Sequence, residues 1–162
     1  MGKVILICGK ICSGKTSYAA RIRERENAVL LSVDEATFAL TQNEQGAFYN
    51  VLARRINGYL RRKAVEIARA GCNVILDWGF WSRDDRRDIA AYLRENGTAY
   101  EWHYVAVDDA AWRQQIEARN SRVAQGGGGS DFYVDEGLLR KCLSLFCEPA
   151  RDEMDVWYTP NA

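Results

Sequence analysis

The chain has 162 residues, 48% of them hydrophobic, and its 22 lysine and arginine side chains balance 22 aspartate and glutamate side chains. A chain of this length is typical of one domain with a sizeable core, so we expect residues 1–162 to form a single domain. The balanced charge gives no global electrostatic reason for binding nucleic acid or a membrane surface.

The cysteines and the apolar segments of the sequence indicate the cellular compartment in which the protein is expected. The five cysteines are odd in number and none shows CxxC spacing, which disfavours a disulfide framework and a zinc site. No stretch of about 18 apolar residues is present to span a membrane, and a strand-like run occupies the place of a signal peptide's apolar segment. We therefore expect a cytoplasmic protein without a membrane partner.

Apolar, β-branched runs alternate along the chain with segments of helical periodicity. The runs are Val4–Cys8, Val29–Val33, Val74–Leu76 and Tyr104–Val107, and Asp155–Tyr158 is expected to add a short edge strand. Such alternation is typical of a parallel sheet covered by helices. The fold class predicted from the sequence is therefore α/β.

Five helices are expected between these runs, from apolar spacing, capping residues and terminal glycines. Ser82 and Asp85 form a capping-box pattern at the start of one of them. The five run from the glycine-rich turn to about Arg25, from about Phe48 to Gly71, from Ser82 to Gly97, from Asp108 or Asp109 through Ile116, and from Leu138 to Phe146 before Pro149.

The turn after the first apolar run, GKICSGKT, has the spacing of a phosphate-binding P-loop. Its two fixed glycines lack a Cβ, so backbone N–H groups can turn inward toward phosphate oxygens beside a helix N-terminus. Lys15 adds a positive charge for the β- and γ-phosphates, and Thr16 offers a hydroxyl to Mg²⁺. The alternative, a glycine-rich turn that binds no phosphate, agrees less well with the sequence. The residues expected to bind the nucleotide are Gly9, Lys10, Ile11, Cys12, Ser13, Gly14, Lys15, Thr16 and Ser17.

Asp34 directly follows the second apolar run. Ligands of a parallel sheet bind beyond the carboxyl ends of its strands, so this carboxylate would face the nucleotide phosphates. There it could accept the proton of an acceptor hydroxyl, which makes Asp34 the candidate catalytic base. The alternative is that Asp34 only caps a helix beginning around Glu35.

Asp77 and a group of aromatic residues follow the third run. Asp77 resembles a Walker B carboxylate that holds Mg²⁺ directly or through water, and it could bind substrate instead. The next residues suggest either a wall for a planar or sugar-like substrate or ordinary core packing. The residues expected to bind substrate are Asp34, Asp77, Trp78, Phe80, Trp81 and Arg83, and those expected to bind the metal are Thr16 and Asp77.

A lid is expected over residues 119–134, where a helix leads into the glycine string Gly126–Ser130. Arg119 and Arg122 would swing over the phosphates and neutralise charge that develops on the γ-phosphoryl group, which adds them to Lys15 and Asp34 as catalytic candidates. The string is expected to be a mobile loop, and it is either native or an engineered linker.

Together, the P-loop, the Ser-Val-Asp ending in Asp34, the segment Leu76–Arg83 and the arginine-bearing lid resemble small P-loop kinases of adenylate-kinase-like topology. More narrowly, they resemble a bacterial group of AAA-domain kinases related to chloramphenicol phosphotransferase, zeta toxins, gluconate kinases and the kinase domain of polynucleotide kinase. The resemblance implies a three-layer α/β/α fold with a five-stranded parallel sheet of order 2-3-1-4-5 and a mobile lid. It also implies ATP with Mg²⁺, and it assigns Asp34 as the base and Arg119 and Arg122 as lid arginines. The adenine would lie between the lid and residues 148–152.

The function expected from the sequence is transfer of the γ-phosphoryl group of ATP to a hydroxyl of a small molecule, such as a metabolite, a sugar-like compound or an antibiotic. One alternative is a polynucleotide 5′-hydroxyl kinase, because five basic residues gather on the second helical region: Arg54, Arg55, Arg61, Arg62 and Lys63. A second alternative is a nucleotide-dependent switch that hydrolyses ATP without an acceptor. The balanced charge weighs against the first and Asp34 against the second.

Overall fold

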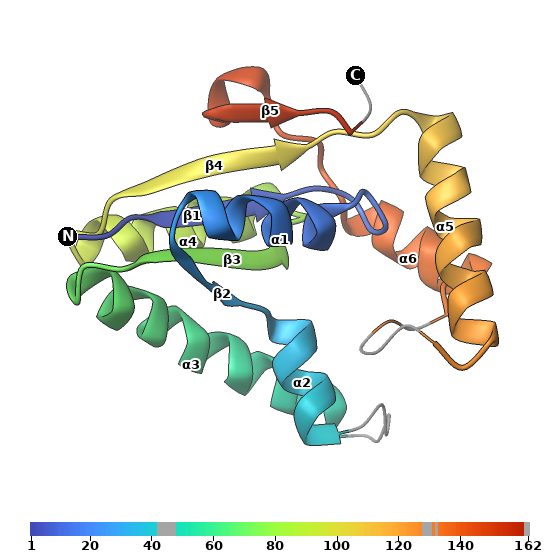
Figure 1. The fold of residues 1–162 in the computed structure, drawn as a ribbon, viewed down its shortest axis with the longest axis horizontal. Coiled ribbons are helices and arrows are strands. Elements are labelled where there is room, and N and C mark those ends of the chain that lie inside the picture. The colour runs from blue at the N-terminus through green and yellow to red at the C-terminus, as the bar shows by residue number, and fades with distance from the viewer. Residues whose placement is uncertain (42–47, 128–130, 132, 161–162) are drawn as a thin grey trace.

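The computed structural model describes residues 1–41, 48–127, 131 and 133–160, and at its centre lies a five-stranded sheet (Figure 1). Its strands are β1 (Val4–Cys8), β2 (Ala28–Leu31), β3 (Asn73–Gly79), β4 (Tyr100–Val105) and β5 (Val156–Tyr158). Neighbouring strands are all parallel, and their order is β2-β3-β1-β4-β5. The predicted α/β class and the strand order 2-3-1-4-5 are confirmed.

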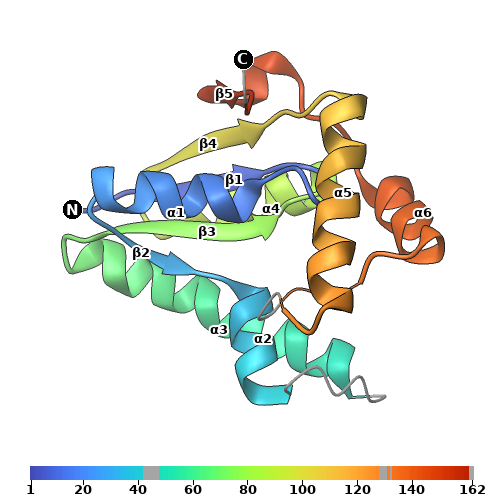
Figure 2. The same ribbon diagram turned by 45° about the vertical axis from the view of Figure 1, so that its right-hand side comes forward.

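Helices cover both faces of the sheet, α1 on one and α3 and α4 on the other, while α5 and α6 lie beyond the carboxyl ends of the strands (Figures 1 and 2). The helices are α1 (Lys15–Arg25), α2 (Val33–Thr41), α3 (Tyr49–Arg69), α4 (Arg83–Glu95), α5 (Asp109–Ala124) and α6 (Glu136–Leu145), with a short 3-10 turn over Arg151–Glu153. Alternate residues of β1 face opposite layers: Val4 and Leu6 pack with α3 and α4, whereas Ile5 and Ile7 pack with α1. Because both faces are covered, all five β1 residues are buried, as expected of a central parallel strand.

Capping side chains fix several helix starts where the sequence predicts them. Ser82 and Asp85 form the reciprocal capping box at α4. Of the two aspartates that could cap α5, Asp108 is the capping residue, because its carboxylate accepts the N–H of Ala111 at 2.9 Å. Within the described parts of the chain, no helix has both the length and the apolar character needed to cross a membrane.

Several boundaries differ from the sequence prediction, and α2 adds a helix to the five expected; the clearest shifts are those of the fourth and second strands. The fourth strand begins at Tyr100 rather than Tyr104, because residues 100–103 continue the pairing with β1 although Glu101 and His103 interrupt the apolar pattern. The second strand ends at Leu31, and Val33 already belongs to α2. Here Ser32 accepts the N–H of Glu35 through its hydroxyl at 3.2 Å, so the helix starts two residues earlier than expected.

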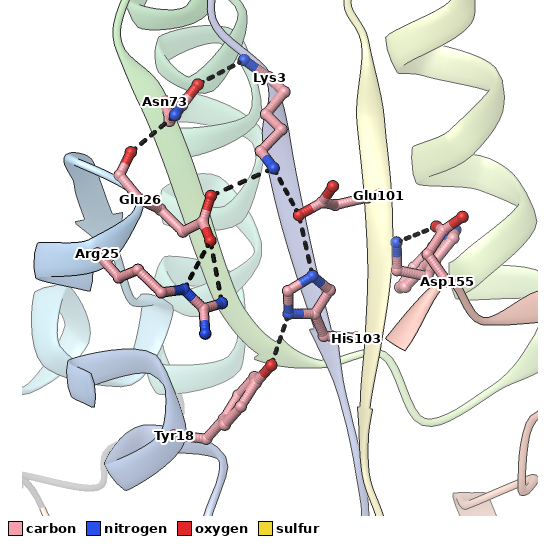
Figure 3. Close-up of polar contacts among 9 residues, drawn as sticks. Lys3, Tyr18, Arg25, Glu26, Asn73, Glu101, His103 and Asp155 are labelled. Carbon is pink, nitrogen blue, oxygen red and sulfur yellow. Dashed lines mark hydrogen bonds and ion pairs between the residues drawn. The ribbon is translucent and has the colours of Figure 1, made fainter. Parts of the chain in front are cut away.

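The polar residues of β4 belong to a network between the sheet and α1 (Figure 3). Lys3 Nζ contacts Glu26 at 3.2 Å and Glu101 at 2.8 Å, and Glu101 lies 3.0 Å from His103 Nε2. On its other side, His103 Nδ1 lies 2.9 Å from the hydroxyl of Tyr18 on α1. His103 is therefore a buried structural residue that joins helix to sheet.

Burial lowers the pKa of His103, against the opposing effect of Glu101. The unfolded chain, in which the imidazole has its ordinary pKa, therefore binds a proton more readily than the folded chain as the pH falls. We expect the free energy of unfolding to decrease on mild acidification, and to decrease less in His103→Gln. Denaturant titrations of both proteins at neutral and mildly acidic pH test this expectation, and identical pH dependence would rule out His103 as its source.

Candidate active site

The P-loop joins the buried end of β1 to the start of α1, where α1 presents its free N–H groups. Gly9 is required sterically, because a Cβ there would lie 2.6 Å from Ser13 Oγ and 3.0 Å from the carbonyl oxygen of Val105. Gly14 has a φ of 90° and precedes the first helical residue, Lys15. The two glycines thus permit the tight path that brings the loop back over the sheet edge.

A cavity of about 430 Å³ opens in front of this loop. It is lined by Cys12, Gly14, Lys15, Thr16 and Ser17, by Gln115, Ala118, Arg119 and Arg122 of α5, and by Asp131 and Pro160. Burial lowers the pKa of Lys15, and the nearby Asp77 carboxylate opposes this effect. The Lys15 ammonium meanwhile donates to the carbonyl oxygen of Lys10 at 2.8 Å. A partly dehydrated cation beside helix N–H groups is suited to phosphate oxygens.

Thr16 and Asp77, the two predicted metal ligands, are in contact. The Thr16 hydroxyl donates to Asp77 Oδ2 at 2.8 Å, and Asp77 is only 7% exposed near the end of β3. Hydroxyl and carboxylate oxygens are the hard ligands that Mg²⁺ prefers, so the pair fits that ion. No cluster of three or more His, Cys, Asp or Glu side chains arranged for a metal occurs among the described residues. An ion here would therefore take further ligands from phosphate oxygens and water.

Asp34 lies in the first turn of α2 and does not cap it, because Ser32 fills that position. The capping interpretation of Asp34 is therefore wrong. The residue is exposed overall, but it lies at the edge of a second cavity, where the surrounding protein atoms withdraw its carboxylate from much of the water. Burial raises the pKa of Asp34, the negative charge of Asp77 adds to this, and Lys15 and Arg119 oppose it. A carboxyl group with a raised pKa is a stronger proton acceptor than an ordinary aspartate.

The second cavity, called the acceptor cavity below, has a volume of about 350 Å³. It is lined by Ile11, Asp34, Asn57, Arg61, Trp78, Phe80, Trp81, Asp85, Asp88, Ile89 and Arg119. Arg119 lines this cavity and the P-loop cavity, so the two hollows meet at its side chain. The site thus has one compartment beside the phosphate loop and another beside Asp34.

The three aromatic residues after Asp77 both pack on the core and line a cavity. Trp78 and Phe80 pack on the core under α3 and α4, Trp81 packs beside α6, and all three line the acceptor cavity. The turn that places them has positive φ at Gly79 (80°) and Phe80 (45°). A Cβ at Gly79 would lie 2.6 Å from Trp81 Nε1, so glycine is needed there for the indole to fold back.

Arg86 holds this aromatic turn and was missed by sequence reasoning. It is 4% exposed, its Nη1 donates to the carbonyl oxygens of Phe80 (3.3 Å) and Cys147 (3.0 Å), and its Nε donates to Glu153 at 3.0 Å. Its signal in the sequence is its spacing, because Arg86 shares the apolar face of α4 with Ile89. A charge on that face implies a buried partner.

Arg83 does not lie where the sequence predicts. It contacts Glu153 at 3.4 Å and lines a third hollow, outside both cavities of the site, because its place at the start of α4 turns it away from the aromatic turn. The Arg83 side chain is half exposed and shares Glu153 with Arg86. It was expected to bind substrate, and in the structure it contacts Glu153 instead.

Replacing Arg86 by methionine is expected to lower the free energy of unfolding by about 3–5 kcal/mol, because Glu153 would lose its buried partner and the carbonyl groups of Phe80 and Cys147 would lose a donor. Arg83→Met removes a more exposed guanidinium from the same glutamate, and its expected cost is below about 1 kcal/mol. Urea denaturation of the two variants measures both values. Equal decreases in the free energy of unfolding for the two variants would mean that Arg86 is not the main residue that stabilises the turn.

Both predicted lid arginines line the P-loop cavity, but they lie in the last turns of α5 and not in a loop. Arg119 contacts Asp131 at 3.3 Å and Arg122 contacts it at 3.4 Å. Asn120 bonds both backbone groups of Val134, at 2.7 and 2.9 Å, and so joins the two ends of the segment. Residues 128–130 and 132 of the predicted lid, including most of the glycine string, lie outside the described residues.

The segment 148–152, where the resemblance places the adenine, does not line the P-loop cavity. Glu148 instead accepts the hydroxyl of Tyr104 at 3.0 Å. The cavity borders α5 and Pro160, which follows β5 in the chain.

The comparisons with known proteins agree with this architecture. Residues 4–149 match the family model described as AAA domain. No protein of curated function matches the sequence significantly. A protein of Chloroflexus aurantiacus, provisionally named a kinase, superposes with a TM-score of 0.73 at 16% identity, over 98% of this chain and 84% of that one.

Two further solved structures have named activities. The APS kinase of Mycobacterium tuberculosis, solved in complex with AMPPNP and APS, has a TM-score of 0.65 at 16% identity over 99% of this chain and 90% of its own. A gluconokinase of Sinorhizobium meliloti has a TM-score of 0.65 at 13% identity over 99% and 83%. At these identities the likeness establishes the fold and not the substrate. The family match over residues 4–149 shows that the chain belongs to the AAA domain family, and it has the fold of the small P-loop kinases.

Proposed function

We propose that the protein is an ATP-dependent kinase that transfers the γ-phosphoryl group to a hydroxyl of a small molecule. The observation that carries the proposal is the position of Asp34, a carboxylate of raised pKa at the edge of a cavity that adjoins the P-loop cavity at Arg119. A protein that only hydrolyses ATP needs no second cavity with a base. The APS kinase structure, which holds a nucleotide analogue and a second substrate, is consistent with two adjoining sites in this fold.

In the proposed reaction, the N–H groups at the start of α1 and the Lys15 ammonium bind the β- and γ-phosphates. Asp34 takes the proton from the acceptor hydroxyl while that oxygen forms a bond to the γ-phosphorus and the bond to the bridging β–γ oxygen breaks. The products are ADP and the phosphate ester of the acceptor. Arg119 and Arg122, on the wall of the P-loop cavity, stabilise the negative charge on the transferring group.

Thr16 and Asp77 would hold Mg²⁺, which neutralises phosphate charge when it is bound. The protein itself positions the reacting groups. The buried strands β1 and β3 fix the P-loop and Asp77, and α2 fixes Asp34 opposite them. Positioning of this kind accounts for much of the rate enhancement in phosphoryl transfer.

The basic residues of α3 give limited support to a polynucleotide acceptor. Arg61 contacts Asp88 at 2.7 Å, Lys63 contacts Glu66 at 2.6 Å, and Arg62 donates to the carbonyl oxygen of Gly58. The two carboxylates neutralise two of the five positive charges that a phosphate backbone would contact, and Arg62 is bonded to its own helix. The small-molecule acceptor is therefore the better supported proposal.

The direct test is incubation of the protein with a metabolite extract and ATP labelled at the γ-phosphate, followed by mass spectrometry. The proposal predicts at least one newly labelled phosphate ester that is missing when Asp34→Asn replaces the wild-type protein. A 5′-hydroxyl oligonucleotide in a parallel reaction tests the polynucleotide alternative. Labelled inorganic phosphate as the sole product would favour the switch ATPase.

A further inference from the structure

The guanidinium groups that line the acceptor cavity are both engaged by carboxylates. Arg61 contacts Asp88 at 2.7 Å, and Arg119 contacts Asp131 at 3.3 Å. The Arg61 guanidinium also lies 4.4 Å from the ring centre of Tyr92. Arg61 therefore presents no open bidentate site for an anionic group of the acceptor, and Arg119, which also lines the P-loop cavity, is the arginine that the proposed reaction assigns to the γ-phosphoryl group.

Carboxylates exceed cations around the same cavity. Asp34, Asp85 and Asp88 line it against Arg61 and Arg119, and just beyond this lining Asp77 raises the pKa of Asp34 while Lys15 lowers it. The segments outside the described residues, 42–47, 128–130, 132 and 161–162, contain no lysine, arginine or histidine in the sequence. They cannot supply a missing cation. An anionic acceptor would thus lose its hydration beside negative charge without a new partner.

The cavity also has an apolar part to its lining. Trp78, Phe80 and Trp81 line it together with Ile11 and Ile89. The rings are held by packing, with the centres of Trp78 and Phe80 5.7 Å apart at an interplanar angle of 35°, and Arg86 fixes the backbone between them and α4. A fixed aromatic surface binds flat apolar groups, and a cavity of about 350 Å³ is at the small end of ligand sites.

We propose that the acceptor is an alcohol without an anionic group that places a flat apolar part against Trp78, Phe80 and Trp81. This inference rests on the proposed function and narrows it. It excludes phosphate and sulfate esters, sugar acids and polynucleotide ends as acceptors, and it makes the Arg61–Asp88 pair a determinant of specificity. With Asp88 in place, the guanidinium is neutralised and anionic molecules are rejected.

Three probes with the same indole ring and different side-chain charge test the proposal: tryptophol, tryptamine and indole-3-acetate. Their binding is measured by ligand-observed NMR to protein saturated with AMPPNP and Mg²⁺, so that the nucleotide cavity is filled. We expect tryptophol and tryptamine to bind at least about tenfold more tightly than indole-3-acetate, a difference of roughly 1.4 kcal/mol. Equal or tighter binding of indole-3-acetate overturns the proposal.

The variant Asp88→Asn tests the specificity determinant by a gain of binding. It leaves the aromatic wall unchanged and removes the carboxylate partner of Arg61, whose side chain lines the cavity. We expect indole-3-acetate to bind about tenfold more tightly than to the wild type, with tryptophol changed less than about twofold. Asp84→Asn is the matched control, because Asp84 is an exposed residue of the same helix that does not line the cavity. No gain over this control contradicts the role of the pair.

Calorimetric titration of AMPPNP into the same samples distinguishes a failure of the inference about the acceptor from a failure of the proposed kinase function. If AMPPNP binds and the charge preference among the three probes is missing, the inference about the acceptor fails and the proposed kinase function stands. If AMPPNP itself does not bind the wild-type protein, the proposed function fails. Tenfold discrimination by a protein that binds AMPPNP supports both.

Discussion

Asp34→Asn is expected to lower the rate of phosphoryl transfer by about 10²- to 10⁴-fold, the usual contribution of a positioned general base. The amide has the same shape as the carboxylate and cannot take the hydroxyl proton. Asp34 lines the acceptor cavity and is not among the residues that line the P-loop cavity. The dissociation constant of AMPPNP should therefore change by less than about threefold, as for a residue that acts in the transition state.

Glu35→Gln is the matched control, since it makes the same chemical change one residue along the first turn of α2 at an exposed carboxylate. Its transfer rate should stay close to wild type. Because burial and Asp77 raise the pKa of Asp34, the wild-type rate should fall on acidification at higher pH than an ordinary aspartate would dictate. Unchanged transfer in Asp34→Asn would remove Asp34 from the mechanism.

Lys15→Met is expected to weaken nucleotide binding and transfer together by about 10²- to 10³-fold, because the variant lacks the ammonium that lines the P-loop cavity. The folded protein without nucleotide should not be less stable. Burial lowers the pKa of Lys15, which means that folding disfavours its charged form, and methionine relieves that cost. Isothermal titration with AMPPNP and thermal unfolding of the nucleotide-free protein measure the two effects.

Lys63→Met controls for loss of a lysine charge, because Lys63 contacts Glu66 on its own helix and lines neither cavity of the site. This variant should bind AMPPNP as the wild type does. Wild-type affinity in Lys15→Met would show that the cavity beside the P-loop is not where the phosphates bind.

The parts of the fold that the sequence predicts are those governed by local rules. The apolar runs mark the buried strands β1 and β3, and the P-loop follows from glycines at fixed spacing. Capping boxes depend on residues three apart, so Ser82 and Asp85 were identifiable. The strand order 2-3-1-4-5 came from the resemblance to P-loop kinases, because periodicity alone does not determine which strands are neighbours.

The rest depends on contacts between distant segments. Glu101 and His103 break the apolar pattern of β4 because they pair with Lys3 and Tyr18, which no local rule reveals. The spacing of Arg86 places it on the apolar face of α4, but only the structure shows its partners in the aromatic turn and at Glu153. Arg83 differs from it by three positions, which is enough to place it outside the site.

The aromatic turn is a second place where the sequence alone could not decide the role of the residues. From the sequence, Trp78, Phe80 and Trp81 had to be either core or substrate wall, and in the structure each ring packs on the core and borders the cavity. Large rings commonly do both because one face can be buried while an edge stays accessible.

A crystal structure with AMPPNP and Mg²⁺ tests the central claim most directly. The account predicts the triphosphate against the N–H groups at the start of α1 and the Lys15 ammonium, with the γ-phosphate directed toward Asp34 and the acceptor cavity. A nucleotide bound elsewhere, or a γ-phosphate separated from Asp34 by the body of the protein, would contradict it.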